Sequence, residues 1–458
     1  MTRAAPDRQD DRVVRIGCGS GWWGDPIEPA RRIAAEGRLD YLCFETMAEV
    51  TISAAQVRRR RDPEFAGYET HLDARAEAVL PACIEQGVRI VSNQGWINPV
   101  GAAERYADHA RRIGAAGIRI AAVEGSLITD RILDLADTIL ETGAPLADLA
   151  DAIVSAEVYL GVAGILEALA GGAQIVVTGR VADPSIFAAP LIHEFGWSLD
   201  DWDRLGQAHG IGHLLECGTQ VTGGYFADPG FKDVPALWDL GLPIAEVSAD
   251  GTAILSKLDG TGGAIDLRTV KEQMLYEVFD PAAYITPDVV VDFTTVELAT
   301  AGPDRVRVAG ISGHPRPDML KASIGCLEGF VGEDWFYHAG PGAIDRAMLG
   351  VDVLRHRLAA AGMSAFSVDL LGVNALHRAA TPADVPTPHE IGIRVTAHGA
   401  TREDAEKIAR AVDGMAVSGV GMTGKRLPGS DRVREVVGVW SALVPRAAVP
   451  PRVHWVEV

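Results

Sequence analysis

The chain has 458 residues, of which 48% are hydrophobic and 23% charged, and its formal net charge is −20 at pH 7. This length and composition are typical of a globular protein with a large core and two or three domains. The negative charge repels phosphate backbones and anionic lipids, and no apolar run is long enough to span a bilayer. We therefore expect no nucleic-acid binding and no membrane binding.

The start of the chain and the cysteines indicate the compartment. Residues 1–12 contain no apolar stretch of the kind a secretory signal needs, so we expect a disordered lead there. Five scattered cysteines occur, none in a Cys-x-x-Cys pair: Cys18, Cys43, Cys83, Cys217 and Cys326. This pattern argues against disulfides and thiolate zinc sites and predicts a reducing, cytoplasmic location.

The first half of the chain alternates short apolar runs with amphipathic segments. The apolar runs predict strands at 13–18, 40–45, 88–93, 118–123 and 174–179. The segments between them predict helices at 26–36, 74–86, 102–115 and 132–141. Strands that are apolar throughout and separated by helices indicate an α/β fold: a mostly parallel sheet with helices on both faces.

Beyond Gly241 the runs alternate apolar with polar residues, and turn-forming residues separate them. This pattern predicts an α+β region with antiparallel strands. A helix is expected near 343–361. In the last part, a helix should begin with Thr401 as N-cap and Asp404 three residues later, close to a capping box. The expected parts are a lead (1–12), an α/β domain with the site loops (13–240), a mixed α+β region (241–362) and a small α+β closing unit (363–458). The expected seams are 144–153 and 382–390.

The loops after the predicted parallel strands are the expected site. The carboxyl ends of such strands meet at one edge of a sheet, where binding and catalytic residues usually lie. Each loop carries a glycine or a carboxylate that a purely structural connection would not need. The loops are 19–25, 45–49, 93–99, 124–126 and 179–185.

The first of these loops resembles a dinucleotide fingerprint. Gly19, Gly21 and Gly24 fit G-x-G-x-x-G after a strand, and Glu45 stands where a ribose-binding acid would. Two tryptophans and the charge of Asp25 oppose a pyrophosphate at this position. In the alternative interpretation, Asp25 caps the next helix and its carboxylate faces the site.

Polar residues are concentrated in the stretch 173–235. They are Arg180, Asp183, His193, His209, His213, Glu216, Cys217 and Tyr225. His209, His213 and Glu216 would share one face of a helix and are a weak candidate set for a divalent ion. Gly210 and Gly212 count against that helix, and surface histidines are the alternative.

The same stretch could perform acid–base chemistry. His213, Glu216 and Cys217, with Tyr225 nearby, could transfer protons, and Cys217 could be a nucleophile or simply a buried thiol. Arg180 could clamp a substrate carboxylate or phosphate, or pair with Asp183 to fix the loop.

Amides and lysines complete the candidate set. Asn93 and Gln94 could donate to a substrate carbonyl or oxyanion, although a turn around Pro99 explains them equally well. Lys257 and Lys321 lie near glycine-rich turns, where either could meet an anionic ligand such as the phosphates of coenzyme A.

Several long motifs resemble one family. The chain resembles the acyclic terpene utilisation (AtuA-like) family over about 14–445. The similar motifs are RIGCGSGWWGDPIEPA, DYLCFET, TGRVADPS, GHLLECGTQVTGGYFADPG and KDVP, together with later segments. The matching motifs carry Arg180, Asp183, His213, Glu216, Cys217 and Tyr225, whereas His209 departs from the family pattern.

The resemblance implies catabolism of branched or isoprenoid acids through acyl-CoA intermediates. It favours a lyase or hydratase acting on a coenzyme A thioester, with no required cofactor and with a divalent metal left open. Glu45, Glu124 or Glu216 would be the base, His213 its partner, and Asn93 an oxyanion donor.

Two other functions remain open at this point. One is a nicotinamide-dependent oxidoreductase that uses the glycine fingerprint at 19–24. The other is a non-catalytic accessory subunit of an acyl-CoA carboxylase. In each case a small-molecule ligand and a homo-oligomer are expected.

Overall fold

The computed structural model describes residues 12–363, 365–382, 387–426 and 431–458. Most of the predicted lead and part of the predicted seam at 382–390 lie outside these ranges. The chain divides into two compact units. Unit 1 is Met1–Gly325 with Val439–Val458, and unit 2 is Cys326–Gly438.

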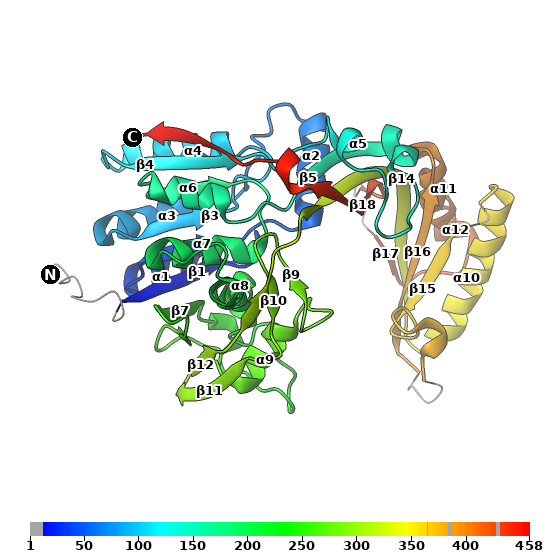
Figure 1. The fold of residues 1–458 in the computed structure, drawn as a ribbon. Helices are drawn as coiled ribbons and strands as arrows, with labels where there is room; N and C mark the ends of the chain where they lie inside the picture. Colours follow the sequence, from blue (N-terminus) through cyan, green and yellow to red (C-terminus); the bar gives the residue numbers. More distant parts are fainter. Residues whose placement is uncertain (1–11, 364, 383–386, 427–430) are drawn as a thin grey trace. The chain divides into compact units, whose positions relative to one another are not determined.

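Unit 1 is built on a sheet that has ten strands among the described residues, in the order β11-β12-β8-β7-β1-β2-β3-β6-β4-β19 (Figure 1). The central strands β1, β2, β3, β6 and β4 are parallel. The flanking strands are antiparallel. The bounds are Val13–Ser20 (β1), Tyr41–Phe44 (β2), Arg89–Ser92 (β3), Arg119–Glu124 (β4), Ile175–Thr178 (β6), Pro243–Ser248 (β7), Ala253–Lys257 (β8), Glu297–Gly302 (β11), Arg305–Ala309 (β12) and Arg452–Glu457 (β19).

Helices cover both faces of the parallel strands, as predicted. Side chains alternate between the faces of a strand, so Leu42 and Phe44 enter a core with α1, α3 and α4. Cys43 points the other way, and its Sγ lies 3.6 Å from the Ile186 carbonyl of α7. The bounds are Ile27–Glu36 (α1), Glu49–Arg61 (α2), Leu72–Gln86 (α3), Pro99–Arg112 (α4), Ile132–Leu135 (α5), Ala163–Ala170 (α6), Asp183–Phe195 (α7), Trp202–Glu216 (α8) and Leu267–Leu275 (α9).

The glycines of α8 do not prevent this helix, contrary to the sequence-based expectation. They allow close packing of a helix that is buried from Leu205 to Glu216. A Cβ at Gly212 would lie 2.5 Å from the Pro184 carbonyl oxygen, at the start of α7. A Cβ at Gly210 would lie 2.5 Å from the end of the Ile311 side chain. The close approach of neighbouring elements outweighs the low helix propensity of glycine.

Shorter strands complete unit 1. A small sheet has the order β13-β10-β9, and β5 lies against the first part of β14, where the Tyr159 amide donates to Lys321 O at 3.0 Å. The bounds are Ile153–Val158 (β5), Tyr284–Ile285 (β9), Val290–Asp292 (β10) and Ser312–His314 (β13). The helix expected at 132–141 ends at Leu135, and β5 and β19 were not predicted.

Unit 2 has the predicted α+β character. Its antiparallel strands have the order β15-β16-β14-β17, with β18 also paired to β14. Thr401 is the N-cap of α11, as predicted: its Oγ1 accepts from the Asp404 amide at 3.2 Å. The bounds are Met319–Ala339 (β14), Ser367–Leu371 (β15), Glu390–Gly399 (β16), Gly424–Lys425 (β17), Val433–Pro445 (β18), Ala343–Ala360 (α10), Arg402–Asp413 (α11) and Met415–Ser418 (α12).

All cysteines are free thiols. Burial raises the pKa of Cys18 and Cys43 well above the ordinary value, so both behave as small buried hydrophobes. Of the helices in the described ranges, none combines the length and the apolar character needed to cross a bilayer.

Candidate functional site

Three of the five predicted loops meet at one cavity of about 1080 Å³ in unit 1. Gly21 follows β1, Glu45 follows β2, and Arg180 follows β6, and all three line the cavity. Asp183, the first residue of α7, lines it as well. This volume is at the upper end of the range for small-molecule sites.

Other wall residues were not named individually from the sequence. Glu49 lies in the predicted loop 45–49, whereas Tyr159, Tyr276, Glu277 and Tyr284 come from segments that were not marked. The apolar residues are Met47, Leu237, Leu240, Phe279, Ile285, Met319 and Leu320. The cavity therefore combines a group of charged residues at the strand ends with a large apolar surface.

Arg180 is buried at the strand-end side of the cavity. Its Nη1 donates to Met47 O at 2.5 Å and to Asp183 Oδ1 at 2.7 Å. Its Cζ lies 4.1 Å from the centre of the Tyr159 ring. Burial disfavours the charge of Arg180, but the negative charge of Asp183 opposes this effect, and the pKa of Arg180 is raised overall. Arg180 thus pairs with Asp183, as one of the two interpretations predicted, and it also lines the cavity.

The carboxyl groups of the cavity are strongly perturbed. Burial raises the pKa of Glu45 and of Glu216 well above the ordinary value, and the charge of Asp183 raises both further. Burial also raises the pKa of Asp183, to about 6, against the opposing charge of Arg180. A carboxyl group with a raised pKa can hold a proton near neutral pH and donate it.

Glu216 is held by His213, three residues earlier on α8. His213 Nδ1 lies 2.8 Å from Glu216 Oε1, while Glu216 Oε2 is buried without a hydrogen-bond partner among the described residues. Burial lowers the pKa of His213 to about 4, so the imidazole is neutral at pH 7. His213 does not line the cavity. It packs against Tyr284, with 5.0 Å between ring centroids, and therefore positions Glu216.

Cys217 and Tyr225 both line the cavity but differ in character. Burial raises the pKa of the Cys217 thiol, and the charge of Glu216 raises it further. A neutral thiol is a poor nucleophile, which argues against a nucleophilic role, although Cys217 is half-buried and not fully buried. Tyr225 is 75% exposed, and its ring centroid lies 6.0 Å from that of Tyr276 in an edge-to-face arrangement.

The two amides after β3 do not line the cavity. Asn93 Nδ2 donates to Glu45 Oε1 at 3.0 Å, and Asn93 Oδ1 accepts from the Thr46 amide at 2.7 Å. Gln94 is buried and donates to Glu69 Oε2 at 3.2 Å. Asn93 therefore positions Glu45 and does not meet a substrate directly, whereas Gln94 belongs to a separate buried network.

The glycines at 19–24 have packing roles. A Cβ at Gly21 would lie 2.1 Å from the backbone carbon of Cys217, and a Cβ at Gly19 would overlap an aromatic ring. The Gly21 amide donates to Asp25 Oδ2 at 2.8 Å, so it is not free for a pyrophosphate. The expected capping role of Asp25 is wrong, because the N-cap of α1 is Pro26 and no side chain caps that helix. Gly24 packs beside the indole of Trp22.

Two predicted candidates lie outside the cavity. Glu124 Oε2 lies 2.7 Å from His454 Nε2 of β19. Glu124 is away from the cavity because β4 is separated from β2 by β3 and β6. His209 Nε2 lies 3.4 Å from Asp288 Oδ2, while His213 contacts Glu216. Over the residues that the structure describes, no three His, Cys, Asp or Glu side chains are grouped to hold a metal ion.

The two lysines differ in environment. Lys257 is buried, with Nζ 3.0 Å from Thr261 O and 3.0 Å from Asp304 Oδ2, so it serves the structure. Lys321 lines the cavity, with Nζ 3.8 Å from Glu49 Oε1 and 5.2 Å from the centre of the Tyr159 ring.

The fold and its cavity define an α/β protein with perturbed carboxyl groups at the carboxyl ends of parallel strands. The chain belongs to the acyclic terpene utilisation family: the model described as "Acyclic terpene utilisation family protein AtuA" matches residues 14–455. No curated protein and no solved structure matches the chain. The family match confirms the resemblance found in the sequence and associates the protein with acyclic terpene utilisation.

Proposed function

We propose that the protein is an acid–base enzyme of acyclic terpenoid breakdown that acts on a branched acyl-CoA thioester or a related carboxylic acid. Its reaction is the addition of water to a double bond or the cleavage of a carbon–carbon bond. The observation that carries the proposal is Glu216: its Oε1 contacts His213 at 2.8 Å, its Oε2 has no hydrogen-bond partner within the described part of the chain, and its pKa is raised by burial.

Both reactions need one group that accepts a proton and another that donates one. In hydration, the base takes a proton from water, the oxygen bonds to C3, and the acid protonates C2. In cleavage, the base takes the proton of a 3-hydroxyl, the C2–C3 bond breaks, and the acid protonates the resulting enolate carbon. Glu45 and Glu216 are our candidates for this pair, since both line the cavity. The raised pKa suits the carboxyl group that donates the proton, and the carboxyl group that is ionised acts as the base.

Arg180 is our candidate for the group that binds the thioester or carboxylate oxygen. A buried guanidinium stabilises negative charge that develops on such an oxygen, because little water competes with it. The apolar wall around Leu240, Phe279 and Leu320 suits a branched hydrocarbon chain.

The test is turnover of 3-methyl-branched enoyl-CoA and 3-hydroxyacyl-CoA thioesters, followed by mass spectrometry. Glu216→Gln and Glu45→Gln should each lower kcat at least about 100-fold, because each removes one proton-transfer group. Glu124→Gln is the matched control: the same chemical change is made outside the cavity and should leave kcat near wild type.

Two results would contradict the proposal. One is full activity in Glu216→Gln. The other is a wild-type protein that is inert toward all these thioesters yet co-purifies with acyl-CoA carboxylase subunits, which would favour the accessory role.

A further inference from the structure

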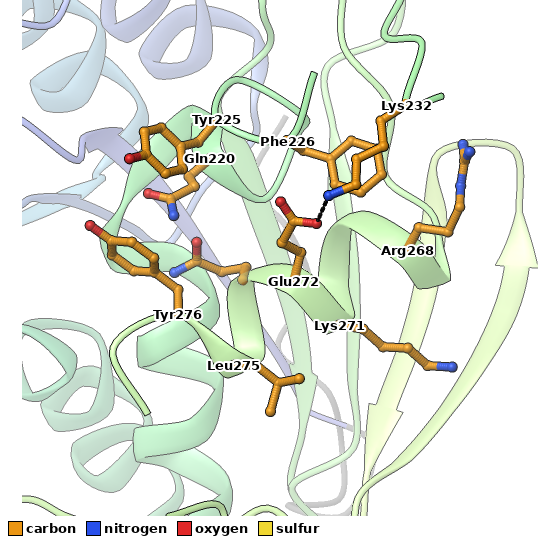
Figure 2. A pocket seen from close by; sticks show the side chains of 10 residues that line it. Gln220, Tyr225, Phe226, Lys232, Arg268, Lys271, Glu272, Leu275 and Tyr276 are labelled. Atoms are coloured by element: carbon orange, nitrogen blue, oxygen red, sulfur yellow. Dashed lines mark hydrogen bonds and ion pairs between the residues drawn. The ribbon is translucent and has the colours of Figure 1, made fainter. Parts of the chain in front are cut away.

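A second cavity of about 600 Å³ adjoins the first in unit 1. Gln220, Tyr225 and Tyr276 line both cavities, so the two share a wall. Figure 2 shows these three side chains at one end of the second cavity, with Lys232, Arg268 and Lys271 toward the other end.

The second cavity is basic in a protein of net charge −20. Three cations line it, Lys232, Arg268 and Lys271, against one carboxylate, Glu272. Glu272 pairs with Lys232 (dashed line in Figure 2), and Arg268 pairs with Asp266 at 2.7 Å. Lys271 is therefore the lining cation that has no ion pair among the described residues. Such a cation within a negative molecule favours binding of an anion at this place.

Helix α9 organises the basic residues. Arg268, Lys271 and Leu275 are spaced by three and four residues, so they share one face of this helix. Phe226 packs beneath two cations: Lys232 Nζ lies 4.7 Å and Arg268 Cζ 5.6 Å from the centre of its ring. These cation–π contacts hold the charged groups in place around the cavity.

The same helix contacts the acid–base group. Gln273 of α9 donates from Nε2 to the backbone carbonyl of His213 at 2.9 Å. A ligand that bridges both cavities would therefore lie along α9, with its anionic end near Lys271 and its other end near Glu216 of α8.

We propose that the second cavity binds the nucleotide end of coenzyme A, so that the pantetheine arm passes Tyr225 and Tyr276 and the acyl group enters the first cavity. This inference rests on the proposed function, since it concerns the coenzyme A moiety of the same substrate. The phosphates of coenzyme A are anionic, and the cations of the second cavity match them. The rings of Tyr225 and Tyr276, at the wall that both cavities share, offer apolar surface to the pantetheine arm.

The test is the Kd of free coenzyme A, measured by calorimetry on the full chain. Lys271→Glu and Arg268→Met should each raise this Kd at least about tenfold. Arg60→Glu is the control for Lys271→Glu, because Arg60 is exposed on α2 and the charge change is the same. Its Kd should stay within about twofold of wild type. Circular dichroism should give all three variants the wild-type melting temperature.

Nucleotide-free thioesters separate this inference from the proposed function. If both hold, Lys271→Glu raises KM for the acyl-CoA substrate but leaves KM for the matching pantetheine thioester unchanged. If coenzyme A binding depends on Lys271 but no thioester is turned over, the inference stands and the proposed function fails. If acyl-CoA and pantetheine thioesters are turned over alike in Lys271→Glu and wild type, the inference fails and the function stands.

Other nucleotides test the identity of the ligand. We expect coenzyme A to bind more tightly than ATP or NADPH. Equal or tighter binding of ATP or NADPH, with the same dependence on Lys271, would overturn the assignment to coenzyme A. Kd values that are the same in wild type and Lys271→Glu would overturn the site itself.

Discussion

Burial controls the protonation of several carboxyl groups in unit 1. Glu157 on β5 shows the effect outside the cavity: burial raises its pKa to about 7, although Ser126 Oγ donates to its Oε2 at 2.7 Å. One hydrogen bond to a carboxylate oxygen does not replace the water that the charged form loses. The same cause raises the pKa of Glu45 and Glu216, where we propose that it serves catalysis.

Glu157 gives a prediction about stability and pH. Its pKa is about 7 in the folded chain against 4.5 ordinarily. Below pH 4.5 the Glu157 carboxyl group is protonated in both the folded and the unfolded chain, so its contribution to stability is fully present. As pH rises through 7 the buried group loses its proton, and this contribution is lost. From pH 4.5 to pH 8, Glu157→Gln should therefore gain up to about 3 kcal/mol in free energy of unfolding relative to wild type. Urea denaturation at both pH values measures this gain, and parallel pH profiles for the two proteins would contradict it.

The geometry of a parallel sheet explains which residues of the candidate site could be predicted from the sequence. Glu45 and Arg180 could be predicted because the carboxyl ends of parallel strands share one edge. The same rule failed for Glu124, because β4 lies two strands farther along the sheet than β3. Tyr159, Glu277 and Tyr284 had no local signal, since packing of distant segments alone brings them to the cavity.

At the scale of elements, the contact between α7 and α8 holds the carboxyl groups of the cavity. Asp183 begins α7 and Glu216 ends α8. Between them, Gly212 brings the backbone of Pro184 so close that a Cβ would lie 2.5 Å from its carbonyl oxygen. Backbone atoms cannot move aside without shifting α7, so this spacing requires glycine.

We predict that Gly212→Ala destabilises the protein although alanine favours helices. Alanine gains about 1 kcal/mol in helix propensity, but overpacking against backbone costs about 1–3 kcal/mol and displaces Asp183 from Glu216. Thermal unfolding should therefore show a lower melting temperature, and kcat should fall.

Gly210→Ala is the control on the same helix. Its Cβ would meet the end of the Ile311 side chain, which can rotate away, so its loss of stability should be smaller than that of Gly212→Ala. A Gly212→Ala protein that is as stable and active as wild type would contradict the prediction, because a methyl group would then fit between α7 and α8.

The elements differ in how well the sequence predicted them. Uniformly apolar runs gave the parallel strands to within two residues, because full burial leaves a continuous hydrophobic signal. β5 was missed because serine and glutamate interrupt IVSAEV, and its partner is distant β14. Helix α8 was doubted because Gly210 and Gly212 have a tertiary cause, the close approach of Ile311 and of Pro184 in α7.

At the scale of the whole molecule, the α/β sheet of unit 1 presents the candidate site and the family match spans residues 14–455. The C-terminal strand β19 pairs antiparallel with β4, so the end of the chain completes the sheet whose other strands carry Glu45 and Arg180. This pairing joins residues that lie far apart in the sequence, such as Arg452 and Glu124, which explains why no local pattern predicted it.

The most direct test of the acid–base cavity is a crystal structure of Glu216→Gln with a slowly converted 3-methyl-branched enoyl-CoA. We expect the thioester oxygen near Arg180, the reacting carbons between Glu45 and residue 216, and the nucleotide beside Lys271. A thioester group bound away from Arg180 and both carboxyl positions would contradict the proposed acid–base cavity.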